Sequence, residues 1–528
     1  MSNNNVFKYI FSVVVVILII GTMFFIVKNR SKNTDYSLDQ TSTASNIQTD
    51  LRLAIAEFDT INPILSNNRN VQEISKIIYE PLITLNENYK MEYCLAEEIA
   101  KSDDLTYVIK LRKGVLWQDN TNFTSEDVKF TMDIIRNIGN TIYNDNLRYI
   151  SDFEVIDSNT LKIYLSQPVA FFEYNLTFPI MCKNYYEGEE FATSSKTPIG
   201  TGPFKIAEIS SNIIKLDRNS IYWNSQKEIM PTEININLYG SIGEVYSAFK
   251  NGEIDILSVK SSNIEQYIGT LGYKKIEYKS REYDFLSLNS ASEKLSDPAV
   301  RRAISLVIDK NNIVNSCLGS GYVSSNFSLD MGCWLYTKDL NIGVDTEQAN
   351  HLLASSGWER SNNSWIKQDS GKTDKLSISL TVNSSNEIRV RVAENIKEQL
   401  GNFGIPVAIQ YLSADSYADA INNRNYEMIL TGIKLGYSPN LNTFFGEGNI
   451  ANYYNPEISE IMGIVSNTSD DNVLYEKYNR LYEIYLEDAP YIGLYRNTDI
   501  VIYNQGLVGN IKANSFNIYH NIEKWYRQ

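Results

Sequence analysis

The side chains that most often carry out chemistry are scarce in this chain, and they form no catalytic pattern. There are 2 histidines, His351 and His520, and 4 cysteines, with no C-x-x-C spacing. The H-E-x-x-H, G-x-S-x-G and G-x-x-x-x-G-K-[ST] motifs, which position metals, nucleophiles and phosphates, do not occur. The sequence therefore predicts no catalytic residues, no metal site and no cofactor.

Adjacent acidic residues could in principle act as paired acid and base catalysts. The pairs are Glu97-Glu98, Asp103-Asp104 and Asp470-Asp471, and each lies in polar surroundings that indicate a solvated loop. Two G-x-G fragments, at Gly200–Gly202 and Gly319–Gly321, lack the third glycine of a phosphate-binding loop. We interpret both fragments as turns.

The composition indicates a large folded protein. The 528 residues carry 48 Lys and Arg against 63 Asp and Glu, a net charge of −15, with no long basic run. This balance argues against nucleic-acid binding. The hydrophobic fraction of 43% is enough for a large core. The 36 Tyr and 20 Phe residues offer contact surface that is apolar in its body and, for Tyr, polar at its tip.

The N-terminus contains an uncharged apolar run at residues 10–27, which as a helix would extend roughly 27 Å, close to the thickness of a bilayer core. It predicts a membrane anchor within residues 1–27, followed by a flexible polar tether at residues 28–50. A cleaved secretory signal is the alternative, although no small-x-small site follows the run directly. Basic residues are more frequent after the run than before it, and this bias alone favours a cytoplasmic body.

The cysteines are Cys94, Cys182, Cys317 and Cys333. None lies near the N-terminal run, so none could carry a lipid just after it. We expect buried free thiols, and a Cys317–Cys333 bridge is the alternative.

Short strands and amphipathic helices alternate along the rest of the chain. Runs that predict strands lie at Leu51–Ile55, Tyr107–Leu111, Leu161–Leu165 and Val407–Leu412. Helices are predicted to start at Thr124–Asp127, where a capping box is present, and at Asp297-Pro298, and to cover Ile388–Leu400 and Leu474–Tyr485. Gly319 and Gly401 are expected to follow helix ends. The alternation indicates α/β lobes with mixed sheets.

A series of short motifs occurs in a fixed order over residues 51–528. The motifs are Asn62-Pro63, Ile78–Leu82, Leu95–Glu97, Ser102–Tyr107, Leu111–Trp117, Phe123–Val128, Pro198–Phe204, Arg218-Asn219, Tyr222-Trp223, Gly252–Asp255, Leu288-Asn289, Asp297–Ile304 and Ile308–Lys310. Together they closely resemble the bacterial extracytoplasmic solute-binding proteins of family 5, the oligopeptide-, dipeptide- and nickel-binding components of ATP-binding-cassette (ABC) importers. Most of these motifs also have a structural interpretation; we expect Gly200 and Gly202 to supply positive φ in a tight turn, and Trp117 and Trp223 to anchor the core.

The resemblance implies an α/β, bilobed, periplasmic-binding-protein-like clamp (type II, cluster C) with an extra inserted subdomain, preceded here by the transmembrane anchor. Lobe I would comprise residues 51–82, 199–288 and 489–528. The inserted subdomain would comprise residues 83–198, and lobe II residues 289–488.

The resemblance also implies where a ligand would bind, in a cleft between the lobes. The expected ligand-binding residues follow the first strand, precede the Leu288-Asn289 strand end, or lie on and after the Met428–Lys434 strand. They are Asn68, Arg69, Asn70, Tyr283, Gly432, Ile433, Lys434, Gly436 and Tyr437. Asn68–Asn70 could equally be a plain surface loop, and Tyr437 a core aromatic.

One position departs from the family pattern. Relatives that capture a free peptide amine carry an Asp in the turn after this strand, where this chain has Gly436, and no acid occurs between Glu427 and Glu447. A buried ammonium group needs a carboxylate or several acceptors. We therefore expect no amine-anchored capture of short peptides, and hypothesise that Lys434 favours a ligand carboxylate or another anionic group.

The resemblance implies a membrane-tethered extracytoplasmic protein that delivers peptides, or a related small solute, to an ABC importer. Its expected partners are the solute, the permease and ATPase subunits and the membrane, with no nucleic acid, and we expect a monomer. This location conflicts with the charge bias at the N-terminus. A tethered ligand sensor of the same fold and an enzyme of unrecognised chemistry are the alternatives.

Overall fold

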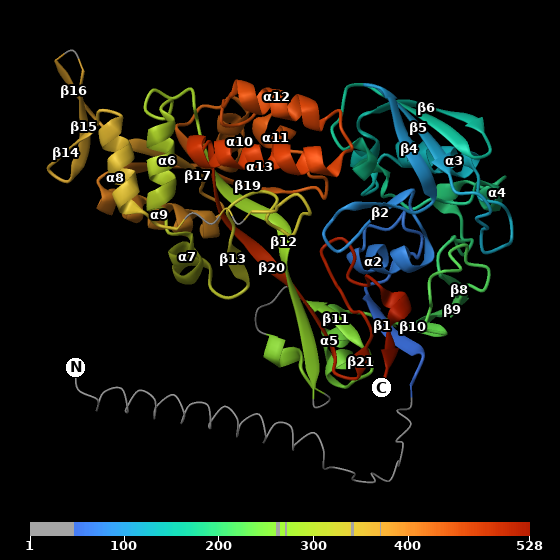
Figure 1. Cartoon of the computed structure of the whole chain (residues 1–528). Coiled ribbons are helices and arrows are strands. Elements are labelled where there is room, and N and C mark those ends of the chain that lie inside the picture. The colour runs from blue at the N-terminus through green and yellow to red at the C-terminus, as the bar shows by residue number, and fades with distance from the viewer. Residues whose placement is uncertain (1–46, 260–263, 270–271, 339, 341–342, 370) are drawn as a thin grey trace, which may run out of the picture. The chain divides into compact units, whose positions relative to one another are not determined.

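The computed structural model describes residues 47–259, 264–269, 272–338, 340, 343–369 and 371–528 (Figure 1). Residues 48–528 form one compact unit. The predicted anchor and most of the predicted tether lie outside the described residues. Among the helices that the structure does describe, none has both the length and the apolar character needed to cross a bilayer.

A four-stranded mixed sheet contains the first strand of the described chain. Its order is β1 (Asp50–Ala56), β10 (Glu233–Tyr239), β9 (Ile213–Arg218) and β8 (Phe204–Ile209), and β1 runs parallel to β10. Helix α2 (Arg69–Ile78) follows β1, and most of its side chains are buried. The predicted strand at residues 51–55 is thereby confirmed.

A second four-stranded sheet is antiparallel and comes from the middle of the first half of the chain. Its order is β4 (Ala96–Asp103), β5 (Thr106–Leu111), β7 (Thr160–Leu165) and β6 (Ile150–Asp157). Helix α3 (Ser125–Ile138) starts with the predicted capping box, which joins Thr124 and Asp127, and ends at Gly139 in the left-handed conformation.

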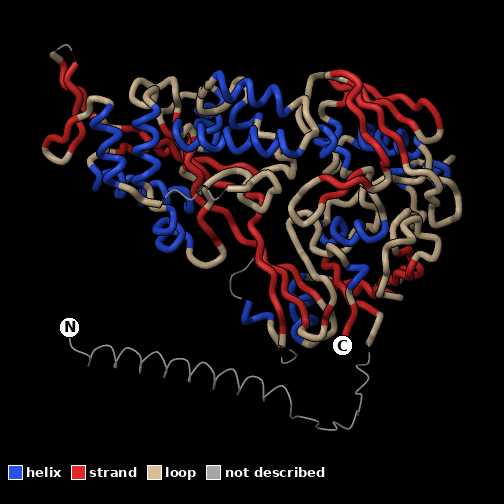
Figure 2. The backbone as a smooth tube through the Cα atoms, viewed as in Figure 1, coloured by secondary structure: helices blue, strands red, loops and turns tan. Residues whose placement is uncertain are grey.

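The third sheet has seven strands and dominates the second half of the chain (Figures 1 and 2). Its order is β11 (Ile256–Val259), β20 (Tyr491–Asn504), β12 (Tyr273–Leu288), β19 (Met428–Lys434), β17 (Ile378–Asn383) and β18 (Val407–Leu412), with β13 (Tyr322–Ser324) paired to β20. The predicted strands at residues 407–412 and 428–434 match β18 and β19.

Helices accompany this sheet along the chain. They are α6 (Pro298–Val307), α7 (Lys310–Ile313), α8 (Thr346–Ser355), α9 (Glu387–Phe403), α10 (Ala414–Asn422), α11 (Asn442–Phe445), α12 (Pro456–Val465) and α13 (Asp471–Asp488). Asp297 caps α6 as predicted, and Gly319 follows the short helix at Val314–Leu318. The prediction that Gly401 ends a helix is wrong, because α9 continues through it and ends at Gly404, whose φ is 95°.

The smaller elements complete the chain. They are β2 (Ile83–Leu85), β3 (Met91–Tyr93), α4 (Lys183–Tyr186), α5 (Ile242–Lys250), β14 (Glu359–Ser361), β15 (Ser364–Asp369), β16 (Lys372–Lys375), β21 (Leu507–Val508) and β22 (Tyr526–Arg527). All four cysteines are free thiols, and three of them are buried, so the alternative Cys317–Cys333 bridge is not formed.

Strands β12 and β20 connect the apolar cores. Ile276 of β12 and Val501 of β20 pack in the core of the two four-stranded sheets, whereas Leu286 of β12 and Ile492 of β20 pack in a core of the seven-stranded sheet. Between these two regions the pairing of β12 with β20 is irregular, with a register shift between Lys279 and Tyr283. The two long strands therefore cross from one core to another through a distorted segment.

Candidate ligand-binding cavity

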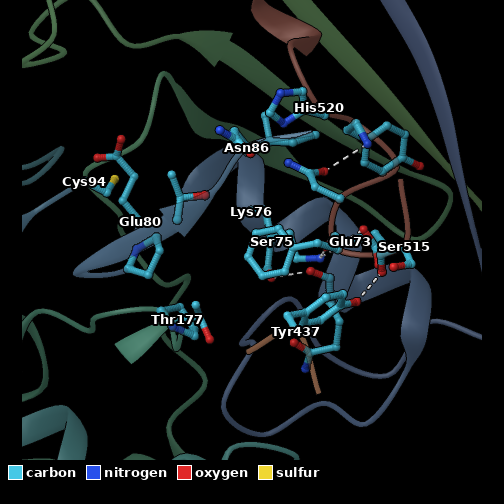
Figure 3. Close-up of a pocket in the computed structure, with 18 of the residues that line it drawn as sticks. Glu73, Ser75, Lys76, Glu80, Asn86, Cys94, Thr177, Tyr437, Ser515 and His520 are labelled. Carbon is cyan, nitrogen blue, oxygen red and sulfur yellow. Dashed lines mark hydrogen bonds and ion pairs between the residues drawn. The ribbon is translucent and has the colours of Figure 1, made fainter. Parts of the chain in front are cut away.

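A cavity of about 1470 Å³ lies beside this distorted segment. Part of its lining comes from α2 and the chain after it, from residues 142–146 and 174–179 on either side of strands β6 and β7, and from residues 222–228. The rest comes from residues 280–282 of β12 and 497–499 of β20, from the turn after β19, and from residues 515–524. Charged side chains of both signs line it. Figure 3 shows part of this wall, where Glu73, Lys76, Tyr437 and Ser515 lie near one another.

Helix α2 forms one wall, and Asn68 fixes how the helix begins. The Asn68 side chain accepts from the Asn70 N–H at 2.9 Å and donates through Nδ2 to the carbonyl oxygens of Ala56 and Glu57, both at 2.9 Å. This cap ties the helix to the end of β1. Arg69, the first residue of α2, faces the cavity, and its guanidinium lies 3.6 Å from the Asp499 carboxylate.

One turn further along α2, Glu73 lines the cavity and is nearly buried. Its carboxylate accepts from Lys76 Nζ at 3.1 Å and from the Ile518 N–H at 3.2 Å. Lys76 Nζ also donates to the Phe516 carbonyl oxygen and lies 5.0 Å from the centre of the Phe516 ring. Glu73 is thus neutralised by its neighbours and fastens the C-terminal segment to α2.

Glu80, just after α2, is a second buried acid at the cavity wall. It accepts hydrogen bonds from Thr201 Oγ1 at 2.9 Å, Tyr222 Oη at 2.8 Å and Trp223 Nε1 at 2.7 Å. Burial raises the pKa of this carboxyl group, and the three donors act in the opposite direction. Glu80 belongs to the Ile78–Leu82 motif, and its hydrogen bonds connect this motif to Pro198–Phe204 and to Tyr222-Trp223. Its contacts make it a structural group.

Tyr437, in the turn after β19, reaches across to the C-terminal segment. Its hydroxyl donates to the Ser515 carbonyl oxygen, and its ring stacks on Tyr89 with centroids 5.6 Å apart and meets Phe516 edge-on at 5.1 Å. The Arg281 guanidinium lies 4.2 Å from the Tyr437 ring centre. Burial raises the pKa of the Tyr437 hydroxyl, so it stays protonated. Tyr437, with a cation on its face, therefore forms part of the wall.

The structure places four of the residues expected from the sequence on the cavity wall, namely Arg69, Lys434, Gly436 and Tyr437. Asn68 and Asn70 are not among the lining residues, because they form the cap of α2. Gly432 and Ile433 also lie outside the lining. At Gly432 an added Cβ would lie 2.3 Å from the Arg389 side chain and 2.8 Å from the Asp284 side chain, which shows how closely these groups pack there.

Tyr283 lies away from the cavity, in the protein interior. Its ring stacks on Phe285 with centroids 5.1 Å apart, and the Arg496 guanidinium lies 4.6 Å from its centre. The neighbouring residues Ser280, Arg281 and Glu282 line the cavity instead.

Several lining segments were missed from the sequence, among them residues 497–499 of β20 and residues 515–524. A signal for the first was present, because Arg496–Asp499 is a polar run inside an otherwise apolar strand. No comparable pattern marks the C-terminal segment, whose position depends on contacts with α2 and Tyr437.

An α/β fold whose cores share two long strands beside a large polar cavity is characteristic of a protein that encloses a solute. The chain belongs to the bacterial extracellular solute-binding proteins, family 5, whose middle-region model matches residues 90–452. The protein is accordingly a solute-binding component of an ABC importer.

Curated relatives and solved structures agree with this assignment. The chain is 25% identical over 501 residues to the oligopeptide-binding protein AppA of Bacillus subtilis, covering 90% of each chain. It is 23% identical over 486 residues to the glutathione-binding protein GsiB of Salmonella choleraesuis, covering 86% of this chain and 90% of GsiB. The unliganded open form of MppA, a periplasmic murein tripeptide-binding protein, has the same fold, with a TM-score of 0.75 at 19% identity, covering 91% of this chain and 97% of MppA.

Proposed function

We propose that the cavity captures peptides, or a related small solute with a carboxylate, and that the protein delivers them to the permease and ATPase subunits of an ABC importer. In this proposal residues 1–27 anchor the protein, with the body on the extracytoplasmic side. The tether is shorter than the expected 28–50, because Gln48 pairs with Arg527 and Asp50 begins β1. The names of AppA, GsiB and MppA, which bind an oligopeptide, glutathione and a murein tripeptide, support a peptide-like ligand.

The observation that carries the proposal is the cavity itself. Its volume of about 1470 Å³ exceeds the roughly 300–1,000 Å³ of most small-molecule pockets, so an extended ligand would fit. Its wall combines aromatic rings with cationic and anionic side chains. Such a wall suits a zwitterionic chain with variable side chains, where water fills the remaining space.

The proposal keeps the domain limits that the resemblance implies, although Leu286 and Ile492, which these limits assign to lobe I, pack in the core of the seven-stranded sheet. Lobe I would comprise residues 51–82, 199–288 and 489–528, with the inserted subdomain at 83–198 and lobe II at 289–488. The irregular pairing of β12 with β20 near Lys279 and Tyr283 would serve as the hinge, because backbone without regular ladder bonds bends more easily. Closure of the lobes would then bury the ligand.

The direct test is native mass spectrometry of the full chain purified from its own host. We expect a co-purified peptide-like solute, and we expect importer subunits to be captured together with the protein. A protein that arrives without solute, binds no peptide from a random-sequence library and captures no importer subunit would contradict the proposal.

Lys434 is expected to bind the ligand carboxylate, because it is an exposed cation on the cavity wall with no acidic partner among the described residues. A hydrogen bond to a charged group is worth about 1.5–3 kcal/mol, so Lys434→Met should weaken binding of peptides with a free C-terminus at least about tenfold. C-amidated peptides should bind equally to both forms in isothermal titration calorimetry.

Lys338→Met is the matched control for Lys434→Met, because Lys338 pairs with Glu483 at 3.0 Å and lies outside the cavity lining. Equal affinity of the wild type and Lys434→Met for free-carboxylate peptides would exclude this role for Lys434.

A further inference from the structure

The turn after β19 carries no acid, but the cavity that it borders does. Nine lining residues are acidic: Glu73, Glu80, Glu87, Glu92, Asp145, Glu228, Glu282, Asp499 and Glu523. Five of them, Glu87, Glu92, Asp145, Glu228 and Glu282, are exposed, so water screens their charge. The remaining four are more enclosed, and these could bind a ligand cation strongly.

Three of the four enclosed acids already have close partners. Glu73 accepts from Lys76 and from a backbone N–H, and Glu80 accepts from three side chains. Glu523 pairs with Lys227 at 2.9 Å. Their charge is therefore compensated within the protein.

Asp499 differs from these three. Its side chain is only 14% exposed, and its nearest cation is Arg69, with 3.6 Å between the nitrogen and the oxygen. No described residue donates a hydrogen bond to its carboxylate. Enclosed carboxylates are normally hydrogen-bonded, so Asp499 presents unused acceptor capacity to the cavity. The Arg69 side chain is 47% exposed, so a ligand could displace its loose contact with Asp499.

The surroundings of Asp499 favour a cation. Tyr278 stands directly opposite Asp499 in the β12–β20 pairing, which places the two side chains on the same face of the sheet. The Tyr278 hydroxyl is buried and has no hydrogen-bond partner in the described protein. Tyr278 does not itself line the cavity, so the group that faces a ligand there is the Asp499 carboxylate, and the neighbouring phenol adds no cation that would neutralise it.

We infer that Asp499 binds a cationic group of the solute, such as the free amine of a peptide, and takes the place of the acid that the turn at Gly436 lacks. The inference rests on the proposed function, since it names the ligand group recognised by the same cavity. Together with Lys434 it describes a cavity that recognises both charged ends of a zwitterion. It runs against the expectation of no amine-anchored capture of short peptides, which considered only acids near the turn in sequence.

The test compares Asp499→Asn with the wild type, both as full chains in detergent, using one random-sequence peptide library in free-amine and N-acetylated forms. Retained peptides are quantified by mass spectrometry. We expect Asp499→Asn to reduce retention of free-amine peptides at least about tenfold and to leave N-acetylated peptides unchanged. The control is Glu460→Gln, which removes an exposed acid outside the cavity and should change neither. Thermal unfolding of each variant shows that the fold is kept.

The outcomes separate the inference from the proposed function. If Asp499→Asn and the wild type retain free-amine peptides equally, the inference is overturned, while the proposed peptide binding stands. A wild type that retains only the N-acetylated peptides also overturns the inference. A wild type that retains neither form overturns both the inference and the proposed function.

Discussion

Replacing Arg496 by Met is expected to lower the free energy of unfolding by about 3 kcal/mol, because the change removes the buried partner of the Asp330 carboxylate and leaves only the partly exposed Lys279 at 3.3 Å as its ion-pair partner. Arg496 is fully buried and lies 2.8 Å from the Asp330 carboxylate, which is 2% exposed. Water therefore cannot replace the lost ion pair.

The same guanidinium satisfies several backbone groups at once. It donates to the carbonyl oxygens of Ser280 at 3.3 Å, Phe327 at 3.1 Å and Ser328 at 2.7 Å. It also donates to Ser325 Oγ at 3.1 Å. These contacts join β20 to β12 and to the segment after β13, next to the irregular pairing that borders the cavity. Met would leave these acceptors unpaired in the interior, which adds to the loss.

Urea unfolding of the wild type and of Arg496→Met measures the effect as a shift in the transition midpoint. Arg480→Met is the matched control, because Arg480 also makes close ion pairs, with Glu457 at 2.6 Å and Glu483 at 3.2 Å, but at the surface. Exposed pairs contribute about 0–1 kcal/mol. Similar shifts for the two variants would show that the buried contacts of Arg496 stabilise the fold no more than a surface ion pair does.

The sequence located several regular elements because their signals are local. The strand predicted at Val407–Leu412 has the same limits in the structure, and the helix starts at Thr124 and Asp297 are where capping residues indicated them. In both cases side-chain alternation or a short-range hydrogen bond decides the structure, so a single stretch of chain is sufficient evidence.

The cavity was harder to predict, because it depends on which face of a strand each residue occupies. Tyr283 was expected at the wall, but the wall is formed by the neighbouring residues 280–282, and Tyr283 packs in the interior. Neighbouring residues of a strand point to opposite faces of the sheet. A bulge inserts an extra residue, and the side chains beyond it then point to the faces opposite to those that simple alternation predicts. The register shift after Lys279 is set by pairing with β20, which sequence patterns do not reveal.

Asp499 shows a related limit. It follows the turn after β19 by about sixty residues in the sequence, yet it lines the same cavity. A search for acids near the turn could not find it, whereas the polar run Arg496–Asp499 within an apolar strand could have indicated it.

Gly200 was expected to supply positive φ, and the structure gives it a different role. Neither Gly200 nor Gly202 has a positive φ. Instead, a Cβ added at Gly200 would lie 1.9 Å from the carbonyl oxygen of Ile78, the last residue of α2, and one at Gly202 would lie 2.6 Å from the same atom. The glycines are needed because two backbone segments approach closely.

Gly200→Ala is therefore expected to lower the free energy of unfolding by about 3 kcal/mol, at the upper end of the usual range for overpacking. The segment cannot move aside easily. The Gly200 N–H donates to Gln118 Oε1 at 3.0 Å, the Gln118 N–H donates to the Gly200 carbonyl at 3.1 Å, and the Gly202 N–H donates to the Ile78 carbonyl at 3.0 Å. Relief of the clash would break one or more of these bonds.

Gly463→Ala is the control, and it is expected to change the free energy of unfolding in the opposite direction. Gly463 lies inside α12, is exposed, and has no atom within 4 Å of an added Cβ. Alanine there should raise the free energy of unfolding by about 0.5–1 kcal/mol, because glycine is the poorer helix former. Urea unfolding of both variants measures the two shifts. A neutral or stabilising Gly200→Ala would mean that the 200–202 segment can move away from α2, and the close approach would then not be what requires glycine at this position.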